Sequence, residues 1–120
     1  MASIINKIHG KDIKKYIANY KSCKISPACC TIQGKLGSLT LNLSAFDGAL
    51  SCSLFFRRVS GNGLISVANN SYTIVSKISE AINIDISKEK IIDIVRPING
   101  IGNIELISID ILSNSDTIPN

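Results

Sequence analysis

The segment "FFRRVSGNGLISV", residues 55–67, holds the residue types that could bind an anion or a sugar. On a strand whose alternate residues are buried, Phe55 and Arg57 point outward together, next to Arg58. An exposed aromatic ring beside guanidinium groups suits contact with a sugar, a phosphate or another protein. The alternative is that Phe55 packs against another part of the molecule and that the arginines pair with acids.

Glycines at positions 61 and 63 raise the question of a phosphate-binding loop. Such a loop needs a third glycine and a helix after it, whereas the residues that follow, "LISVANNSYTIVS", read as a strand. Asn-Gly between two alternating runs predicts a tight turn between antiparallel strands. A similar turn is predicted around Asn99. The candidate binding residues are therefore Phe55, Arg57, Arg58, Asn62 and Asn99.

Catalytic groups are scarce in this sequence. The single histidine, His9, stands apart, and no serine lies in a nucleophile elbow. Four carboxylates alternate with isoleucines and are expected to point away from the core: Asp85, Asp93, Glu105 and Asp110. A hydrolase that uses two of them is a third-ranked hypothesis, and no catalytic residue is predicted.

The four cysteines are Cys23, Cys29, Cys30 and Cys52. Their spacing is irregular, they include no C-x-x-C pair, and one histidine is too few for a typical zinc site. We expect small buried thiols in a reducing compartment, with no metal and no cofactor. If the protein acts outside a cell, the adjacent Cys29 and Cys30 could crosslink subunits.

Charge is unevenly distributed along the chain. Residues 1–60 carry a net charge of +7, and residues 61–120 carry −3. This split favours contact between opposite faces of neighbouring copies, or between a basic face and an anionic partner. Too few aromatic residues accompany the basic ones for a nucleic-acid partner to be expected. No apolar stretch approaches the roughly 18 residues of a membrane span, and no signal peptide is recognisable, so we expect a cytoplasmic or virion-associated protein.

Residues 11–21, "KDIKKYIANYK", show the spacing of an amphipathic helix. The apolar side chains would share one face, and most lysines would lie away from it. The helix is expected to pack on the protein's own core or on a neighbouring copy, within an N-terminal helical segment of residues 1–24. The residues that could serve assembly are Lys7, Lys11, Ile13, Lys14, Tyr16, Ile17 and Tyr20.

From residue 28 onward the apolar residues alternate with polar ones, as in strands. Clear examples are "SLTLNLSA" (38–45) and "AINIDIS" (81–87), and the phase of "NIELISIDIL" (103–112) slips by one residue, which predicts a β-bulge. About eight short strands with turns every 8–12 residues predict an all-β fold. We expect a two-sheet antiparallel, jelly-roll-like sandwich over residues 25–113, followed by a flexible tail over 114–120.

Two segments resemble those of small jelly-roll modules of the carbohydrate-binding type, which also look similar to structural proteins of tailed phages. The first is "RVSGNGLI" (58–65), and the second is "RPINGIGNIELISI" (96–109). The resemblance covers residues 37–112 and implies a sandwich closed by these two segments. It also implies that saccharide recognition would use exposed tryptophans or tyrosines, of which the sandwich region has only Tyr72.

These observations give three functional hypotheses. The first is a non-catalytic module that self-associates into a homo-oligomer or decorates a larger assembly, such as a phage virion or a filament. The second is a carbohydrate-binding module with a glycan partner, and the third is the hydrolase based on outward carboxylates. Higher salt would weaken an assembly held by opposite charges but not stacking on a sugar.

Overall fold

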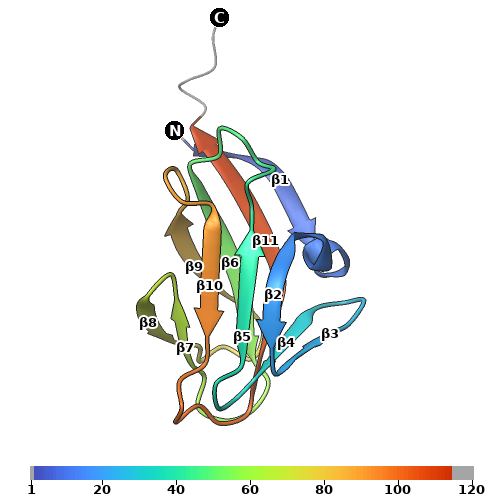
Figure 1. The fold of residues 1–120 in the computed structure, drawn as a ribbon, viewed down its shortest axis with the longest axis vertical. Coiled ribbons are helices and arrows are strands. Elements are labelled where there is room, and N and C mark those ends of the chain that lie inside the picture. Colours follow the sequence, from blue (N-terminus) through green and yellow to red (C-terminus); the bar gives the residue numbers. More distant parts are fainter. Residues whose placement is uncertain (1, 115–120) are drawn as a thin grey trace, which may run out of the picture.

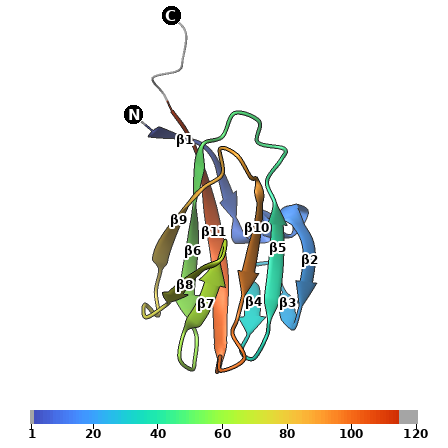
Figure 2. The same ribbon diagram turned by 60° about the vertical axis from the view of Figure 1, so that its left-hand side comes forward.

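The structure of this chain, a computed structural model, describes the backbone of residues 2–114 and the side chains of residues 6–112. Two antiparallel sheets pack face to face, as seen by comparing Figures 1 and 2. The expected two-sheet sandwich is thus confirmed, but the described part of the chain contains eleven strands rather than about eight. No helix in this part is long and apolar enough to cross a membrane.

The first sheet has six strands, with β11 near its centre. Its order is β3 (Cys23–Ile25), β4 (Cys30–Gln33), β11 (Asn103–Asn114), β6 (Ser51–Arg58) and β9 (Glu80–Asp85), and β1 (Ala2–His9) also pairs with β11. The first part of β11 pairs with β4 and its second part with β1, while β6 runs along its other side. One long strand therefore holds together segments from both ends of the sequence.

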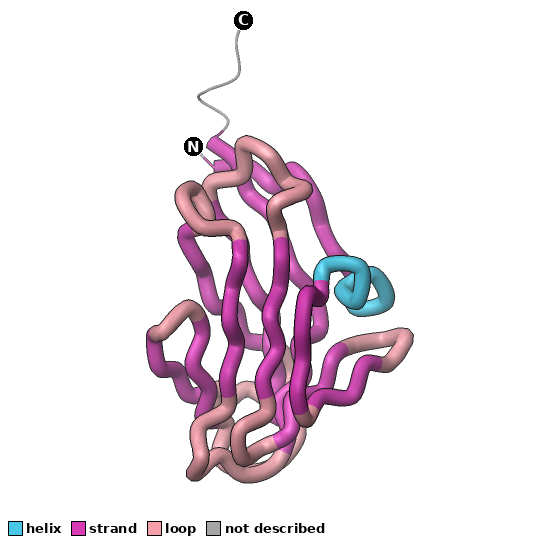
Figure 3. Tube along the Cα trace, viewed as in Figure 1, coloured by secondary structure: helices cyan, strands magenta, loops and turns pink. Residues whose placement is uncertain are grey.

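The second sheet has five strands, all shorter than β11. Its order is β2 (Ile17–Lys21), β5 (Ser38–Asn42), β10 (Ile91–Val95), β7 (Leu64–Val67) and β8 (Asn70–Thr73). Figure 3 shows that the strands are joined mostly by loops at the two ends of the sandwich. One end, at the bottom of Figure 1, gathers the loops of residues 34–37, 59–63 and 97–102.

The core lies between the sheets, and the alternating pattern correctly predicted much of it. On β5 and just after it, the side chains of Leu39, Leu41 and Leu43 are fully buried, and the polar residues between them are half-buried or exposed. On β9, Ile82 and Ile84 are buried in the same way. Branched aliphatic side chains suit such a pleated, half-buried surface, and removing them from water supplies most of the stabilisation.

The predicted β-bulge in the last strand is also confirmed. In the pairing of β11 with β6, the register shifts between Leu106 and Ser108. Before the shift Leu106 is buried, and after it Ile109 and Ile111 are buried. The extra residue keeps apolar side chains on the core side along the whole length of β11.

The predicted N-terminal amphipathic helix is wrong in type and extent. A 3-10 helix of seven residues, η1 (Gly10–Tyr16), is followed directly by β2. Ile17 lies opposite Leu41 of β5, so the backbone of this region is paired within a sheet. Residues 2–9, which precede η1, pair with β11. The predicted tail, residues 114–120, lies outside the described residues except for Asn114, the last residue of β11.

The turn around Asn62 is present, but it is not the predicted hairpin. It joins β6 in one sheet to β7 in the other, and positive φ angles occur at Gly61 and Gly63 rather than at Asn62. A two-residue hairpin turn lies instead between β7 and β8. There Ala68 and Asn69 have φ angles of 50° and 68°, as a type I′ turn requires.

Candidate binding surface

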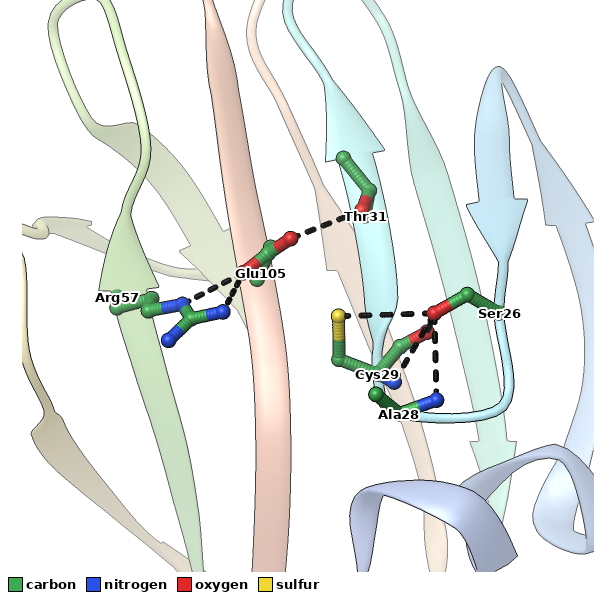
Figure 4. A network of polar contacts seen from close by, with 6 residues as sticks. All are labelled: Ser26, Ala28, Cys29, Thr31, Arg57 and Glu105. Carbon is green, nitrogen blue, oxygen red and sulfur yellow. Dashed lines mark hydrogen bonds and ion pairs between the residues drawn. The ribbon is translucent and has the colours of Figure 1, made fainter.

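The predicted patch of Phe55, Arg57 and Arg58 is largely engaged in contacts within the protein. Phe55 is half-buried, and Arg57 lies opposite Glu105 on the neighbouring strand. The Arg57 Nε and Nη2 atoms each lie 2.5 Å from Glu105 Oε1, and Thr31 Oγ1 donates to Glu105 Oε2 at 3.4 Å (Figure 4). For Arg57, the structure therefore agrees with the alternative prediction, in which the arginines pair with acids.

Arg58 is less constrained. Its Nη1 atom donates to the carbonyl oxygen of Gly61 at 2.9 Å. Arg57, Arg58, Val59, Lys77 and Glu105 line a shallow hollow of about 310 Å³. One carboxylate faces three cations here, so the local charge is positive.

Asn62 has a structural role that the sequence did not reveal. Its Oδ1 atom accepts hydrogen bonds from the backbone nitrogen of Ile101 at 3.1 Å and from Arg96 Nη2 at 3.4 Å. Its Nδ2 atom donates to the carbonyl oxygen of Asn99 at 2.9 Å. The two segments that carry the family resemblance therefore contact one another, and Asn62 joins them.

Arg96 is fully buried and has no carboxylate among its partners. Besides Asn62, its guanidinium donates to carbonyl oxygens of Ile32, Leu64, Ile101 and Gly102, at distances of 2.6–3.2 Å. Burial lowers the pKa of this group. The arginine fixes strands and loops of both sheets at this end of the sandwich. A signal was present in the sequence, because Arg96 directly follows the alternating strand "IIDIV" and begins the second resembling segment.

The outer face of the five-stranded sheet is rich in hydroxyl and amide groups. One row of directly paired residues crosses all five strands: Lys21, Ser38, Val95, Ser66 and Ser71. In the next row Thr40 Oγ1 donates to Asp93 Oδ1 at 2.8 Å. Ser38, Thr40, Ser66 and Asp93 alternate with buried residues along their strands, so they face away from the core.

Two hollows lie beside the β7–β8 hairpin. One, of about 350 Å³, is lined by Leu64, Ile65, Ser66, Ser71, Tyr72, Thr73, Pro97 and Asn99. The other, of about 420 Å³, is lined by Ala68, Asn69, Glu89, Ile91 and Asp93. The first combines apolar surface with neutral polar groups, whereas the second contains two carboxylates. Asn99 is the predicted binding residue that lies in the first hollow.

Tyr72 is the sandwich tyrosine singled out by the resemblance. Its partner across the hairpin is Ile65, whose side chain is buried. Tyr72 is half-buried and packs partly against the core while also lining the neutral hollow of about 350 Å³. It contributes part of the wall rather than a fully exposed stacking platform.

The predicted assembly residues are spread over β1, η1 and β2. Ile13 is fully buried, and Tyr16 packs against Phe46 with ring centroids 5.1 Å apart. Tyr20 is 54% exposed and Ile17 is half-buried. Lys7 Nζ lies 3.6 Å from Asp110 Oδ1, while Lys11 and Lys14 are exposed. Ile13 and Tyr16 thus serve the protein's own packing.

The carboxylates of the hydrolase hypothesis are in separate surroundings. Asp85 is exposed on β9, and hydrogen bonds from the side chain and backbone of Ser87 lower its pKa. Asp93 lies on the other sheet and accepts from Thr40. Asp110 was expected to be exposed, but it is buried between neighbouring strands beside Lys7. Glu105 pairs with Arg57 and is mostly buried.

The cysteines are free thiols, three of them buried and Cys23 half-buried. Burial raises the pKa of Cys30 and of Cys52 to about 12. Ser26 closes the turn before β4, because its Oγ accepts from the backbone nitrogens of Ala28 and Cys29 (Figure 4). Within the described residues, no three His, Cys, Asp or Glu side chains are grouped so that they could hold a metal ion.

Comparison with known proteins identifies a similar fold. No protein-family model matches the chain, and no curated protein matches it. Among solved structures, the carbohydrate-binding module TmCBM27, described for its specific recognition of mannan, matches with a TM-score of 0.54 and 4% sequence identity. The match covers 96% of this chain and 99% of that chain. At this identity the similarity shows the fold alone, and the expected resemblance to such modules is confirmed at that level.

Proposed function

We propose that this chain is a non-catalytic module that binds a saccharide on the outer face of its five-stranded sheet. The site is the neutral hollow between the β7–β8 hairpin and residues Pro97–Asn99. The observation that carries the proposal is the grouping of three serine or threonine hydroxyls and one amide beside the apolar surfaces of Leu64 and Pro97.

This composition suits the chemistry of a sugar ring. A sugar presents hydroxyl groups that both donate and accept hydrogen bonds, and patches of C–H surface between them. Ser66, Ser71 and Thr73 can donate and accept, and the Asn99 amide can do both. The volume of about 350 Å³ lies within the range of small-molecule sites. The hollow is lined by no charged side chain, which favours a neutral sugar.

The fold similarity supports this function over assembly into a particle or filament, which ranked first from the sequence. The similar solved structure is a carbohydrate-binding module that recognises mannan. Because Tyr72 is half-buried and the chain has no tryptophan, stacking contributes little. We expect weak affinity, with a Kd of about 0.1–1 mM.

The test is an NMR titration of the uniformly labelled protein with soluble mannan, and then with soluble glucan and xylan fragments. Shifts should concentrate at Ser66, Ser71, Thr73 and Asn99. The double variant Ser71→Ala/Asn99→Ala should weaken binding by about tenfold, since two hydrogen-bonding groups are lost. Gln33→Ala is the matched control, because it removes an exposed amide from the other sheet. Shifts that map to the six-stranded sheet, or no shifts with any of these sugars, would contradict the proposal.

A further inference from the structure

The loop end of the sandwich, defined as residues 34–37, 59–63 and 97–102, exposes four large aliphatic side chains. These are Leu36 (52% exposed), Val59 (48%), Ile98 (70%) and Ile101 (64%). They come from three loops that are far apart in the sequence. The grouping is independent of the saccharide hollow, although Pro97 and Asn99 belong to the same loop.

Backbone hydrogen bonds hold these three loops together. Gly34 donates to the carbonyl oxygen of Gly102 at 2.6 Å, and Leu36 donates to that of Pro97 at 3.4 Å. Asn62 donates to the carbonyl oxygen of Ile101 at 3.1 Å. The aliphatic side chains therefore project from loops that are hydrogen-bonded to one another. The buried guanidinium of Arg96 also donates to the carbonyl oxygens of Ile101 and Gly102 in this loop end.

Leu36 is not explained by the needs of folding. It is exposed, and its φ of 70° lies in the left-handed region, where a bulky side chain is strained and glycine or asparagine is preferred. A leucine here contributes neither core packing nor an easy turn. Its presence fits a surface on which an aliphatic side chain meets something outside the protein.

Cations accompany these aliphatic side chains. Lys35 is exposed beside Leu36, and Lys77 and Arg58 flank Val59 in the shallow hollow at this end. Two carboxylates of this region already have partners: Glu105 pairs with Arg57, and Glu80 accepts from the backbone nitrogens of Val75 and Ser76. The loop end is thus both apolar and positively charged.

We propose that the loop end docks on an anionic lipid bilayer, with Leu36, Val59, Ile98 and Ile101 entering the interface and the cations facing lipid phosphates. Binding of this kind grows with buried apolar area and with attraction between basic residues and acidic lipids. A second copy is a poorer occupant, because a symmetric contact would place the same cations against one another.

The test is cosedimentation of the full chain with vesicles of 70% phosphatidylcholine and 30% phosphatidylserine, and with vesicles of pure phosphatidylcholine. We expect about tenfold stronger binding to the anionic vesicles, reduced by 0.5 M salt. The variant Ile98→Asn/Ile101→Asn should lower the partition coefficient by about tenfold or more. Lys35→Glu/Lys77→Glu should remove the preference for anionic vesicles. Ile91→Asn, at a 49% exposed isoleucine on β10, is the matched control and should bind as the unchanged protein does.

Thermal melting of each variant shows whether it is folded, and all five isoleucine and lysine positions used here are exposed. Absence of cosedimentation with the anionic vesicles would overturn the proposal. An equal loss of binding in Ile91→Asn would do the same. A dimer in light scattering that Ile98→Asn/Ile101→Asn converts to a monomer would assign the surface to a second copy instead.

Discussion

Asn62 Oδ1 lies 3.4 Å from Arg96 Nη2, although the two residues are 34 positions apart in the sequence. The same oxygen accepts from the backbone of Ile101, and the guanidinium also reaches Ile32 and Leu64. This contact joins the loop that leaves β6 to the loop that enters β11. The residues that made the sequence resemble known sandwich modules are thus residues that build the loop end.

Replacing Arg96 with methionine should destabilise the protein strongly. The substitution keeps an apolar stem of similar length but leaves several buried carbonyl oxygens without donors, so we expect a loss of about 3–5 kcal/mol in the free energy of unfolding. Urea denaturation followed by circular dichroism measures it. Arg58→Met is the control, because that guanidinium makes one exposed hydrogen bond, and it should cost less than about 1 kcal/mol. Equal losses in the two variants would show that the buried contacts of Arg96 add nothing.

A second pair of variants tests the turn between β6 and β7. Gly63 has a φ of 69°, and a Cβ there would come within 2.0 Å of the carbonyl oxygen of Ile74. Gly48 also has a positive φ, of 82°, but a Cβ there would meet nothing within 4 Å. Gly63→Ala should therefore lower the free energy of unfolding clearly more than Gly48→Ala does. Gly48→Ala carries only the penalty of a positive φ at a residue with a Cβ, about 1 kcal/mol. Thermal melts of both variants decide this, and a larger effect at Gly48 would refute it.

Burial of the cysteines predicts a loss of stability at alkaline pH. The pKa of Cys52 is about 12 in the folded protein and 9.0 when unperturbed. The unfolded thiol therefore ionises first, so the stabilisation is complete below pH 9 and is lost as the pH rises toward 12. Between pH 8.5 and 11, the free energy of unfolding of Cys52→Ala should fall by about 2 kcal/mol less than that of the unchanged protein. Urea denaturation at several pH values measures this difference. Parallel pH profiles for the two proteins would contradict this.

Local alternation predicted strands in both sheets, among them β5 of the five-stranded sheet and β9 at the edge of the six-stranded sheet. Leu39 and Leu41, or Ile82 and Ile84, repeat every two residues because one face of their strand meets the core. The bulge in β11 was predictable for the same reason, since a change of phase is visible in the sequence itself.

The N-terminal region could not be predicted in this way. Ile13, Tyr16, Ile17 and Tyr20 have helical spacing, but Ile17 begins a strand paired with Leu41. That pairing is a contact between residues distant in sequence, and it overrides local preference. The turn at Asn62 was misread as a hairpin for a related reason, because the chain crosses there from one sheet to the other.

The candidate site was only partly predictable. Asn99 lines the proposed hollow, whereas Arg57 is neutralised by Glu105 across the strand pair. Ser66 lies between the apolar residues Ile65 and Val67, so its outward direction was readable from the sequence, whereas Ser71 follows Asn70 and carries no such signal. Their position beside Pro97 depends on the order β10-β7-β8 in the sheet, which no local pattern specifies.

The pairing of Ala2 with Asn114 in β1 and β11 has a consequence for how the molecule can be presented. Both ends of the described chain leave the sandwich at the top of Figure 1, opposite the loop end. A polypeptide, a tag or a solid support joined at either terminus would therefore attach the module at one end of the sandwich. The opposite end, the loop end, would then face outward. Immobilisation through a terminus leaves the apolar, cationic loops free to meet a surface, which makes this the natural geometry for binding assays.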